Sequence, residues 1–139
     1  MTTKTTVQTE GRSVEMTAMK LNHLNVIVPD PKQTSQFFVD YFGFRRANSN
    51  GLDTIAVLFG EDGFVLALSN FDKTNVPVYP PGFHFGFIQD TQEQVDSLYE
   101  RLHAAGFATE TPRSFHGSWT FYFNAPGDVS VEVQCLLKR

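Results

Sequence analysis

The sequence predicts an α+β domain made of two similar modules, each with the order strand, helix and then further strands. Several short runs alternate apolar and polar residues, which is typical of half-buried strands. A strand followed by a helix that closes on Gly-Phe occurs twice along the chain. Such a long repeat indicates two βαβββ-like modules related by a pseudo-twofold axis rather than a solenoid. We therefore assign module one to residues 20–71, a Pro-rich linker to residues 72–82 and module two to residues 83–139.

The bulk properties fit one globular domain and exclude several classes of function. The chain has 139 residues, of which 41% are hydrophobic, enough for a single core. A net charge of −4 without a basic run disfavours a nucleic-acid partner. No apolar run approaches the roughly 18 residues of a membrane span, and no secretory leader pattern is visible. The single Cys135 cannot form an internal disulfide, so we expect a cytoplasmic protein. Residues 1–19 are Thr-rich and weakly periodic, as in an N-terminal arm or leader.

Module one is expected to begin with a strand over Leu21–Val28 and to continue with a helix that ends at Phe42. Asp30 suits the N-cap of this helix, and Pro31 suits its first position. Gly43 suits the left-handed residue that ends it. The remaining strands of the module are expected over residues 54–60 and 64–69.

Module two repeats this order with a strand over Phe83–Ile88 and a helix over Asp90–Ala105. Asp90 and Glu93 have the spacing of a capping box, and Gly106 follows the helix. The helix carries an apolar stripe at helical spacing, made of Val95, Leu98, Tyr99 and Leu102. The remaining strands are expected over residues 119–125 and 129–134.

Three of the predicted strands combine an apolar face with a second face that carries His23, His84 or Glu132. These second faces either meet bulk water, as in a one-sided antiparallel sheet, or line a cup formed by a curled sheet. Their shortage of Lys and Glu favours the cup, because solvated faces are rich in both. Two imidazoles and one carboxylate constitute a facial triad, which leaves open positions and suits Fe(II), Mn(II), Zn or Ni.

Three stretches resemble the vicinal oxygen chelate superfamily, which includes glyoxalase I, fosfomycin-resistance thiol transferases, bleomycin-resistance proteins and type I extradiol dioxygenases. They are "NHLNVIVPD…FGF", "FHFGFIQD…VDSLYERLHAAGF" and "FYFNAPGDVSVEV", which together span nearly all of residues 20–136. The resemblance implies paired βαβββ modules that form an open, cup-shaped mixed barrel with one divalent metal ion inside. Carried over residue by residue, the metal ligands are His23, His84 and Glu132. The fourth ligand position of glyoxalase I falls on Ala67, which disfavours that activity.

The stretch "HGSWTFYFNAPGDVSVE" is similar to the signature of extradiol dioxygenases. Tyr122 and Glu132 have the spacing of that signature, whereas His116 lies one residue too near Tyr122. Ser69 and Asn70 occupy the region in which a further family His would serve as the acid/base. The resemblance therefore covers the ligands and the tyrosine but not the complete dioxygenase set.

The same resemblance suggests roles for residues around the metal. Tyr122 would donate a hydrogen bond to substrate oxygens, with a structural tyrosine as the alternative. His116 would act as an acid/base near neutral pH, with an idle surface histidine as the alternative. Asn25 would form a pocket wall, and Trp119 would stack on an aromatic substrate or else pack in the core. Arg45, Arg46 and Arg113 are candidates for holding an anionic substrate, although no sequence feature aims them.

The leading functional hypothesis is a divalent-metal-dependent enzyme that chelates two neighbouring oxygens of a small substrate. Extradiol ring cleavage is the preferred reaction. Thiol transfer or isomerisation of the fosfomycin-resistance or glyoxalase type is the alternative within this hypothesis. A metal-free binding protein of the bleomycin-resistance type, which would sequester an antibiotic between two chains, is a separate alternative. The third hypothesis is a domain that keeps the metal ligands but has no known substrate. Two chains often complete the cups in single-domain members of this superfamily, so we expect a homodimer.

Overall fold

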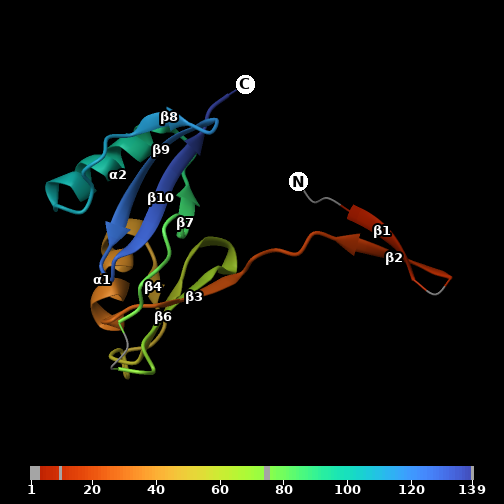
Figure 1. The fold of residues 1–139 in the computed structure, drawn as a ribbon, viewed down its shortest axis with the longest axis horizontal. Helices are drawn as coiled ribbons and strands as arrows, with labels where there is room; N and C mark the ends of the chain where they lie inside the picture. Colours follow the sequence, from red (N-terminus) through yellow and green to blue (C-terminus); the bar gives the residue numbers. More distant parts are fainter. Residues whose placement is uncertain (1–3, 10, 74–75, 139) are drawn as a thin grey trace.

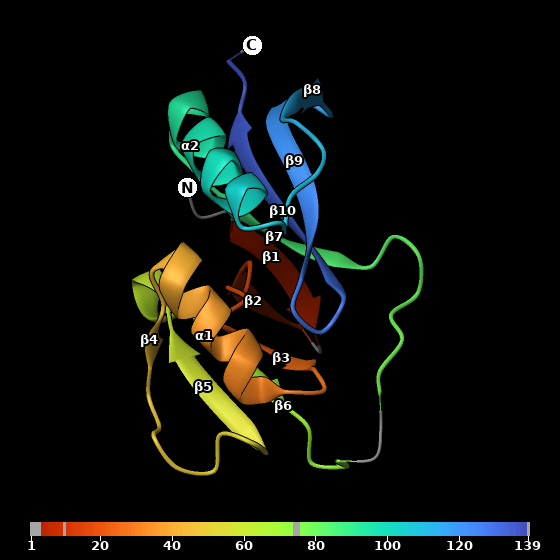
Figure 2. The ribbon, with the colours of Figure 1, turned by 90° about the vertical axis from the view of Figure 1, so that its left-hand side faces the viewer.

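The computed structural model describes residues 4–9, 11–73 and 76–138 and divides the body of the chain into two modules. Each module contributes one helix and one four-stranded sheet that mixes parallel and antiparallel pairs. Both helices cover the same side of the molecule, and the second face of each sheet is turned to the opposite side (Figures 1 and 2). The predicted α+β fold of paired βαβββ modules is confirmed.

Module one forms a sheet with the strand order β3-β6-β5-β4. Asp30 caps the N-terminus of α1 through a side-chain oxygen that accepts a hydrogen bond from the Gln33 backbone N–H. Pro31 opens the helix, and Gly43 ends it in the left-handed conformation, as predicted. The elements of this module are β3 (His23–Ile27), α1 (Pro31–Phe42), β4 (Arg45–Arg46), β5 (Ile55–Phe59), a 3₁₀ turn (Glu61–Gly63) and β6 (Val65–Ser69).

Module two forms a sheet with the equivalent order β7-β10-β9-β8. The N-cap of its helix lies one residue later than predicted. Thr91 is the N-cap, and Thr91 and Gln94 form a complete capping box in place of Asp90 and Glu93. A threonine hydroxyl and a glutamine amide complete the reciprocal pair of hydrogen bonds with the first-turn backbone. The elements are β7 (His84–Ile88), α2 (Gln92–Ala104), β8 (Arg113–Phe115), β9 (Ser118–Ala125) and β10 (Val129–Leu136).

Two parts of the structure were not predicted as strands. The short edge strands β4 and β8 have too few residues to show a periodic pattern. Residues in the expected arm form a hairpin of β1 (Lys4–Thr9) and β2 (Arg12–Thr17). This hairpin projects away from the body on the side of the open sheet faces (Figure 1).

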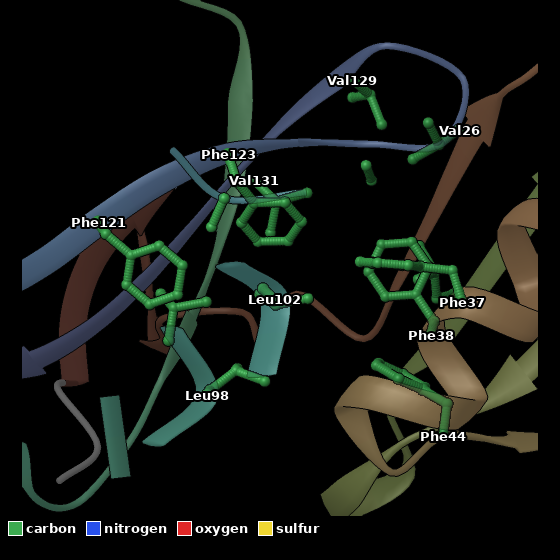
Figure 3. Close-up of a cluster of buried hydrophobic side chains, with 14 of the residues drawn as sticks. Val26, Phe37, Phe38, Phe44, Leu98, Leu102, Phe121, Phe123, Val129 and Val131 are labelled. Carbon is green, nitrogen blue, oxygen red and sulfur yellow. The ribbon is translucent and has the colours of Figure 1, made fainter. Parts of the chain in front are cut away.

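The core lies between the two helices and the apolar faces of the two sheets (Figure 3). Phenylalanines from α1 reach module two, since the ring centroids of Phe37 and Phe107 and those of Phe42 and Phe87 lie 4.7 Å apart in each pair. Phe38 is fully buried and contacts rings of both modules. The heavy phenylalanine content of the sequence therefore serves to join the modules.

Two polar contacts fix the modules at the ends of this core. The Thr34 hydroxyl on α1 donates a 2.9 Å hydrogen bond to the carbonyl of Pro126, in the turn between β9 and β10. In the linker, the Tyr79 hydroxyl donates a 2.6 Å hydrogen bond to the carbonyl of Ile27, and the Tyr79 ring stacks on Phe83 at 4.9 Å. The linker is thus tied to the last residue of β3 and to the residue that precedes β7.

Two simpler expectations can also be compared with the structure. Cys135 is buried on the apolar face of β10, as its alternation with the valines predicts. Among the described residues, no helix is both long enough and apolar enough to cross a bilayer.

Candidate metal and substrate site

The structure brings two of the three predicted metal ligands together on the open face of module two. His84 begins β7, and Glu132 lies in β10, the parallel neighbour of β7. Glu132 is paired with Gly86, whose missing side chain leaves space between the two ligand side chains. The His84 Nε2 and Glu132 Oε1 atoms lie 3.5 Å apart. The alternation of polar residues in these strands therefore predicted a real side-chain cluster.

Neighbouring groups orient both side chains. The Nδ1 atom of His84 lies 3.0 Å from the Gly82 carbonyl oxygen, which can only accept a hydrogen bond. In a neutral imidazole, the proton therefore resides on Nδ1 and leaves a lone pair on Nε2. The Thr120 hydroxyl, which is fully buried, lies 2.7 Å from the second carboxylate oxygen of Glu132, Oε2, and donates to it. Two electron-pair donors, Nε2 and Oε1, are left facing each other.

This pair fits a divalent cation. Two ligand atoms that each lie about 2.1 Å from one metal ion at octahedral or tetrahedral angles are about 3.0–3.4 Å apart. The 3.5 Å between His84 Nε2 and Glu132 Oε1 is close to that range. One imidazole and one carboxylate are two of the three ligands that a facial triad requires.

Tyr122 lies beside this pair on β9, directly opposite Glu132. Its ring meets the His84 ring edge to face, with centroids 5.2 Å apart. Burial raises the pKa of Tyr122 above the ordinary value of 10, and its hydrogen bond to the Glu132 carboxylate and the charge of Glu132 raise the pKa further. The positive charge of Arg113 opposes this shift. Tyr122 is therefore a protonated hydrogen-bond donor at neutral pH.

The third predicted ligand, His23, lies on the other sheet. It begins β3, and its Nδ1 atom lies 2.7 Å from the side-chain oxygen of Asn22. No group of three or more His, Cys, Asp or Glu side chains able to hold a metal ion occurs within the part of the chain that the structure describes. His23 therefore does not join His84 and Glu132 within one chain.

The open face around His23 is mainly apolar. Asn25 is exposed on this face and accepts a 2.9 Å hydrogen bond from the Ser69 hydroxyl. Ala67 is paired with Asn25 in the same way as Glu132 is paired with Gly86, so the register supports Ala67 as the counterpart of Glu132. The other apolar side chains of this face are Ile27, Ile55, Val57, Phe59 and Val65, and Arg45 lies at its edge, paired with Phe59.

Two further predicted site residues lie away from the His84–Glu132 pair. His116 has a positive φ of 51° in the turn between β8 and β9, six residues before Tyr122 and so about 20 Å away along an extended strand. Trp119 lies on the helix side of the sheet, where its Nε1–H donates a 2.7 Å hydrogen bond to Asp96 of α2. The structure brings neither residue to the pair.

Thr120 is the functional residue whose role sequence reasoning missed. It lies two residues before Tyr122 on the same face of β9, so the alternation in "TFYFN" places it there. Its hydrogen bond to Glu132 was not foreseen, because the pairing register of β9 and β10 aligns Thr120 with Gln134 rather than with Glu132.

Two hollows on the surface lie away from the open faces. A hollow of about 510 Å³ lies between α1, Phe107 and Pro126, and another of about 620 Å³ lies between the start of α2 and the end of β10. Neither is lined by His23, His84, Tyr122 or Glu132.

Comparison with known proteins places the chain in a family. A family model described as the Glyoxalase/Bleomycin resistance protein/Dioxygenase superfamily matches residues 20–133. A solved structure of a possible glyoxalase from Bacillus cereus is 39% identical, with a TM-score of 0.75, and the match covers 85% of this chain and 100% of that one. No curated protein matches the chain.

Two more distant structures share the fold alone. A lactoylglutathione lyase from Agrobacterium tumefaciens is 20% identical, with a TM-score of 0.67 over 85% of this chain and 94% of that one. A glyoxylase/bleomycin resistance protein/dioxygenase domain from Frankia sp. EAN1pec is 19% identical, with a TM-score of 0.74 over 87% of this chain and 94% of that one. Because the family model extends from before β3 into β10, the chain belongs to the Glyoxalase/Bleomycin resistance protein/Dioxygenase superfamily.

Proposed function

We propose that this protein is a divalent-metal-dependent enzyme that binds a small substrate through two neighbouring oxygens, with extradiol-dioxygenase-like ring cleavage as the leading reaction. The observation that carries the proposal is the 3.5 Å distance between His84 Nε2 and Glu132 Oε1 on one open sheet face. Each side chain is oriented by a contact at its other polar atom. His84 Nδ1 lies beside the Gly82 carbonyl, and Glu132 Oε2 accepts from the Thr120 hydroxyl. Supported ligands of this kind are typical of metal sites.

The residues of the site have separate roles in this proposal. His84, Glu132 and His23 hold the metal ion, which supplies Lewis acidity to the bound substrate oxygens. Tyr122 stays protonated and donates a hydrogen bond to one of these oxygens as negative charge develops on it. Asn25 lies beside His23 on β3 and contributes to the wall. The identity of the metal is open among Fe(II), Mn(II), Zn and Ni, since all four accept this donor set.

The third ligand comes from a second copy of the chain. His23 and the His84–Glu132 pair lie on different sheets, and both open faces are turned to the same side of the molecule (Figures 1 and 2). Ile27 and Phe59 on the open face of module one are 41% and 40% exposed, an arrangement that favours a partner. In a homodimer with twofold symmetry, module one of each chain would cover module two of the other.

Metal binding tests the ligand set directly. We expect isothermal titration calorimetry with Mn(II) or Zn(II) to show binding to chelator-treated protein and loss of that binding in His84→Ala, Glu132→Ala and His23→Ala. His103→Ala is the matched control, because His103 lies on α2 and its Nδ1 atom contacts the Ala108 carbonyl. Binding that survives in all three ligand variants would refute the metal site.

A mixed dimer of two variants that do not bind metal tests whether the site is shared between chains. In a mixed dimer of His23→Ala and Glu132→Ala chains, one shared site keeps all three ligands, whereas a site within one chain stays broken in every chain. We therefore expect metal binding to return after the two variants are unfolded together and refolded. No recovery, in a preparation shown to contain mixed dimers, would contradict the shared site.

The reaction is tested with Fe(II), oxygen and a set of catechols. Ring cleavage next to the two hydroxyls gives a yellow product, which we expect from the parent protein and, at a much lower rate, from Tyr122→Phe. If the metal-loaded protein bound catechols without forming this product, the proposal of a dioxygenase reaction would be refuted. The proposal of a metal site would still stand.

A lyase or isomerase is the second candidate, and one observation favours it. The structure that is 39% identical to this chain is that of a possible glyoxalase. Ala67 argues against it, because this position carries no fourth ligand. Conversion of the hemithioacetal of methylglyoxal and glutathione by the metal-loaded protein would support this candidate over ring cleavage.

A further inference from the structure

Phe115 lies between Arg113 and the ring of His116 at the edge of module two. The guanidinium carbon of Arg113 lies 4.4 Å from the centre of the Phe115 ring. The Phe115 ring in turn lies 3.8 Å, centroid to centroid, from the imidazole of His116. His116 and Gly117 both have positive φ in the tight turn that joins β8 to β9. The contact with the Phe115 ring favours a guanidinium position over the edge of the sheet.

Arg113 belongs to the same open face as the proposed metal ligands. It is paired with Thr120, and Thr120 shares its face of β9 with Tyr122. Residues paired across neighbouring strands point to the same side of a sheet. The charge of Arg113 acts on the Tyr122 hydroxyl, which places the two groups in one electrostatic environment.

The spacing between Arg113 and Glu132 suits a ligand with two different ends. Arg113 lies two strands across from Glu132 and two residues along, so the two backbone positions are about 12 Å apart. This space accommodates one aromatic ring with metal-binding oxygens at one end and a further group at the other. A bare diphenol would leave the Arg113 end of the face empty.

Glu132, the carboxylate of this face, lies too far from Arg113 to form an ion pair with it. Among the described residues, its guanidinium forms no ion pair with a carboxylate, and it is the single Lys or Arg on the open face of β7, β8, β9 and β10. A guanidinium presents paired N–H groups that match the two oxygens of a carboxylate. In a chain with a net charge of −4, an unpaired cation marks the point at which an anion is favoured.

We infer that Arg113 binds an anionic group of the substrate, so that the substrate is a small aromatic acid with two neighbouring oxygens rather than a neutral diphenol. This inference rests on the proposed function, because it assumes that the other end of the substrate binds the metal at His84 and Glu132. It narrows the substrate class of that site and assigns a specificity-determining role to Arg113.

The test compares two probes that differ in one charged group. Calorimetry on the Mn(II)-loaded protein measures the affinities for 3,4-dihydroxybenzoate and for catechol. We expect the acid to bind more tightly, and Arg113→Gln to weaken its binding by about 10- to 100-fold, the usual contribution of hydrogen bonds to a charged group. Catechol affinity should stay unchanged, and Arg113→Lys should recover part of the affinity for the acid.

Arg101→Gln is the matched control, because Arg101 lies on α2 at the helix side and contacts Tyr41 and the Asp40 carbonyl. Equal binding of both probes to the parent protein, or an equal loss of both in Arg113→Gln, would overturn the inference and leave the metal site intact. Binding of neither probe, in protein shown to hold Mn(II), would overturn the proposed function and the inference with it.

Discussion

Glu132 depends on its neighbours for its orientation. Its two carboxylate oxygens have different contacts, since Oε2 accepts from Thr120 and Oε1 faces His84 Nε2. A free carboxylate would rotate and offer either oxygen to the metal. The hydrogen bond from the buried Thr120 hydroxyl restricts this rotation, so the Glu132 carboxylate is already oriented in the folded protein before a metal ion binds.

Replacement of Thr120 therefore tests orientation apart from ligand identity. We expect Thr120→Val, which keeps the shape of the side chain and removes the hydroxyl, to lower Mn(II) affinity by about 10- to 100-fold. Thr120→Ser keeps the hydroxyl and should lie close to the parent. Calorimetric titration of all three proteins, each with its fold checked by circular dichroism, gives the comparison. Equal affinities for the valine and serine variants would contradict an orienting role.

At the scale of elements, Tyr79 connects the linker to both modules. Tyr79 bonds to the carbonyl of Ile27 and stacks on Phe83, so one side chain connects β3 of module one to the start of β7 of module two. Burial raises the pKa of Tyr79, although its hydrogen bond to Ile27 opposes the shift. The hydroxyl thus remains a donor throughout the neutral range.

Removal of this hydroxyl should destabilise the protein without disturbing the ring stack. We expect Tyr79→Phe to lower the free energy of unfolding by about 1 kcal/mol, the usual net contribution of one hydrogen bond. Tyr41→Phe is the matched control, because the described contacts of Tyr41 are made by its ring. Urea unfolding followed by circular dichroism measures both variants. A change in Tyr41→Phe as large as that in Tyr79→Phe would remove the linker hydrogen bond as the cause.

At the scale of the whole molecule, the aromatic cluster makes one folding unit of two modules. Phe38 is fully buried and touches Phe44 of module one and Phe85 and Phe87 of module two. Neither sheet has another layer to cover its apolar face. We infer that the two modules unfold together.

Replacement of Phe38 tests this cooperativity. We expect Phe38→Ala to lower the free energy of unfolding by about 3–5 kcal/mol, whereas Phe71→Ala, at a side chain that is 71% exposed, should have little effect. Trp119 lies in module two, so its fluorescence reports on the module that was not mutated. Its urea midpoint should fall together with the circular dichroism midpoint at one fixed protein concentration. An unchanged Trp119 transition would show that the modules unfold separately.

Local patterns predicted much of the fold, because their causes are local. The alternation of apolar residues identified β3, β5, β6, β7, β9 and β10, and the Asp30, Pro31 and Gly43 signals identified the ends of α1. The edge strands β4 and β8 and the N-terminal hairpin escaped prediction, because short or Thr-rich segments carry no periodic signal. The choice of Thr91 over Asp90 as the N-cap of α2 escaped as well, since both residues are good caps.

The sequence by itself determined which side chains lie on the second faces of the sheets. In an extended backbone, successive side chains point to opposite faces whatever the strand is paired with. It therefore identified His23, His84 and Glu132 as candidates, and the resemblance to glyoxalase I assigned the fourth ligand position to Ala67. Only the tertiary structure decided which of these meet. The register of β7 and β10 brings His84 beside Glu132, and β3 places His23 on the other sheet. The pairing of β8 with β9 places Arg113 on the same face as Tyr122. These contacts depend on pairing between distant segments, which spacing along the chain does not specify.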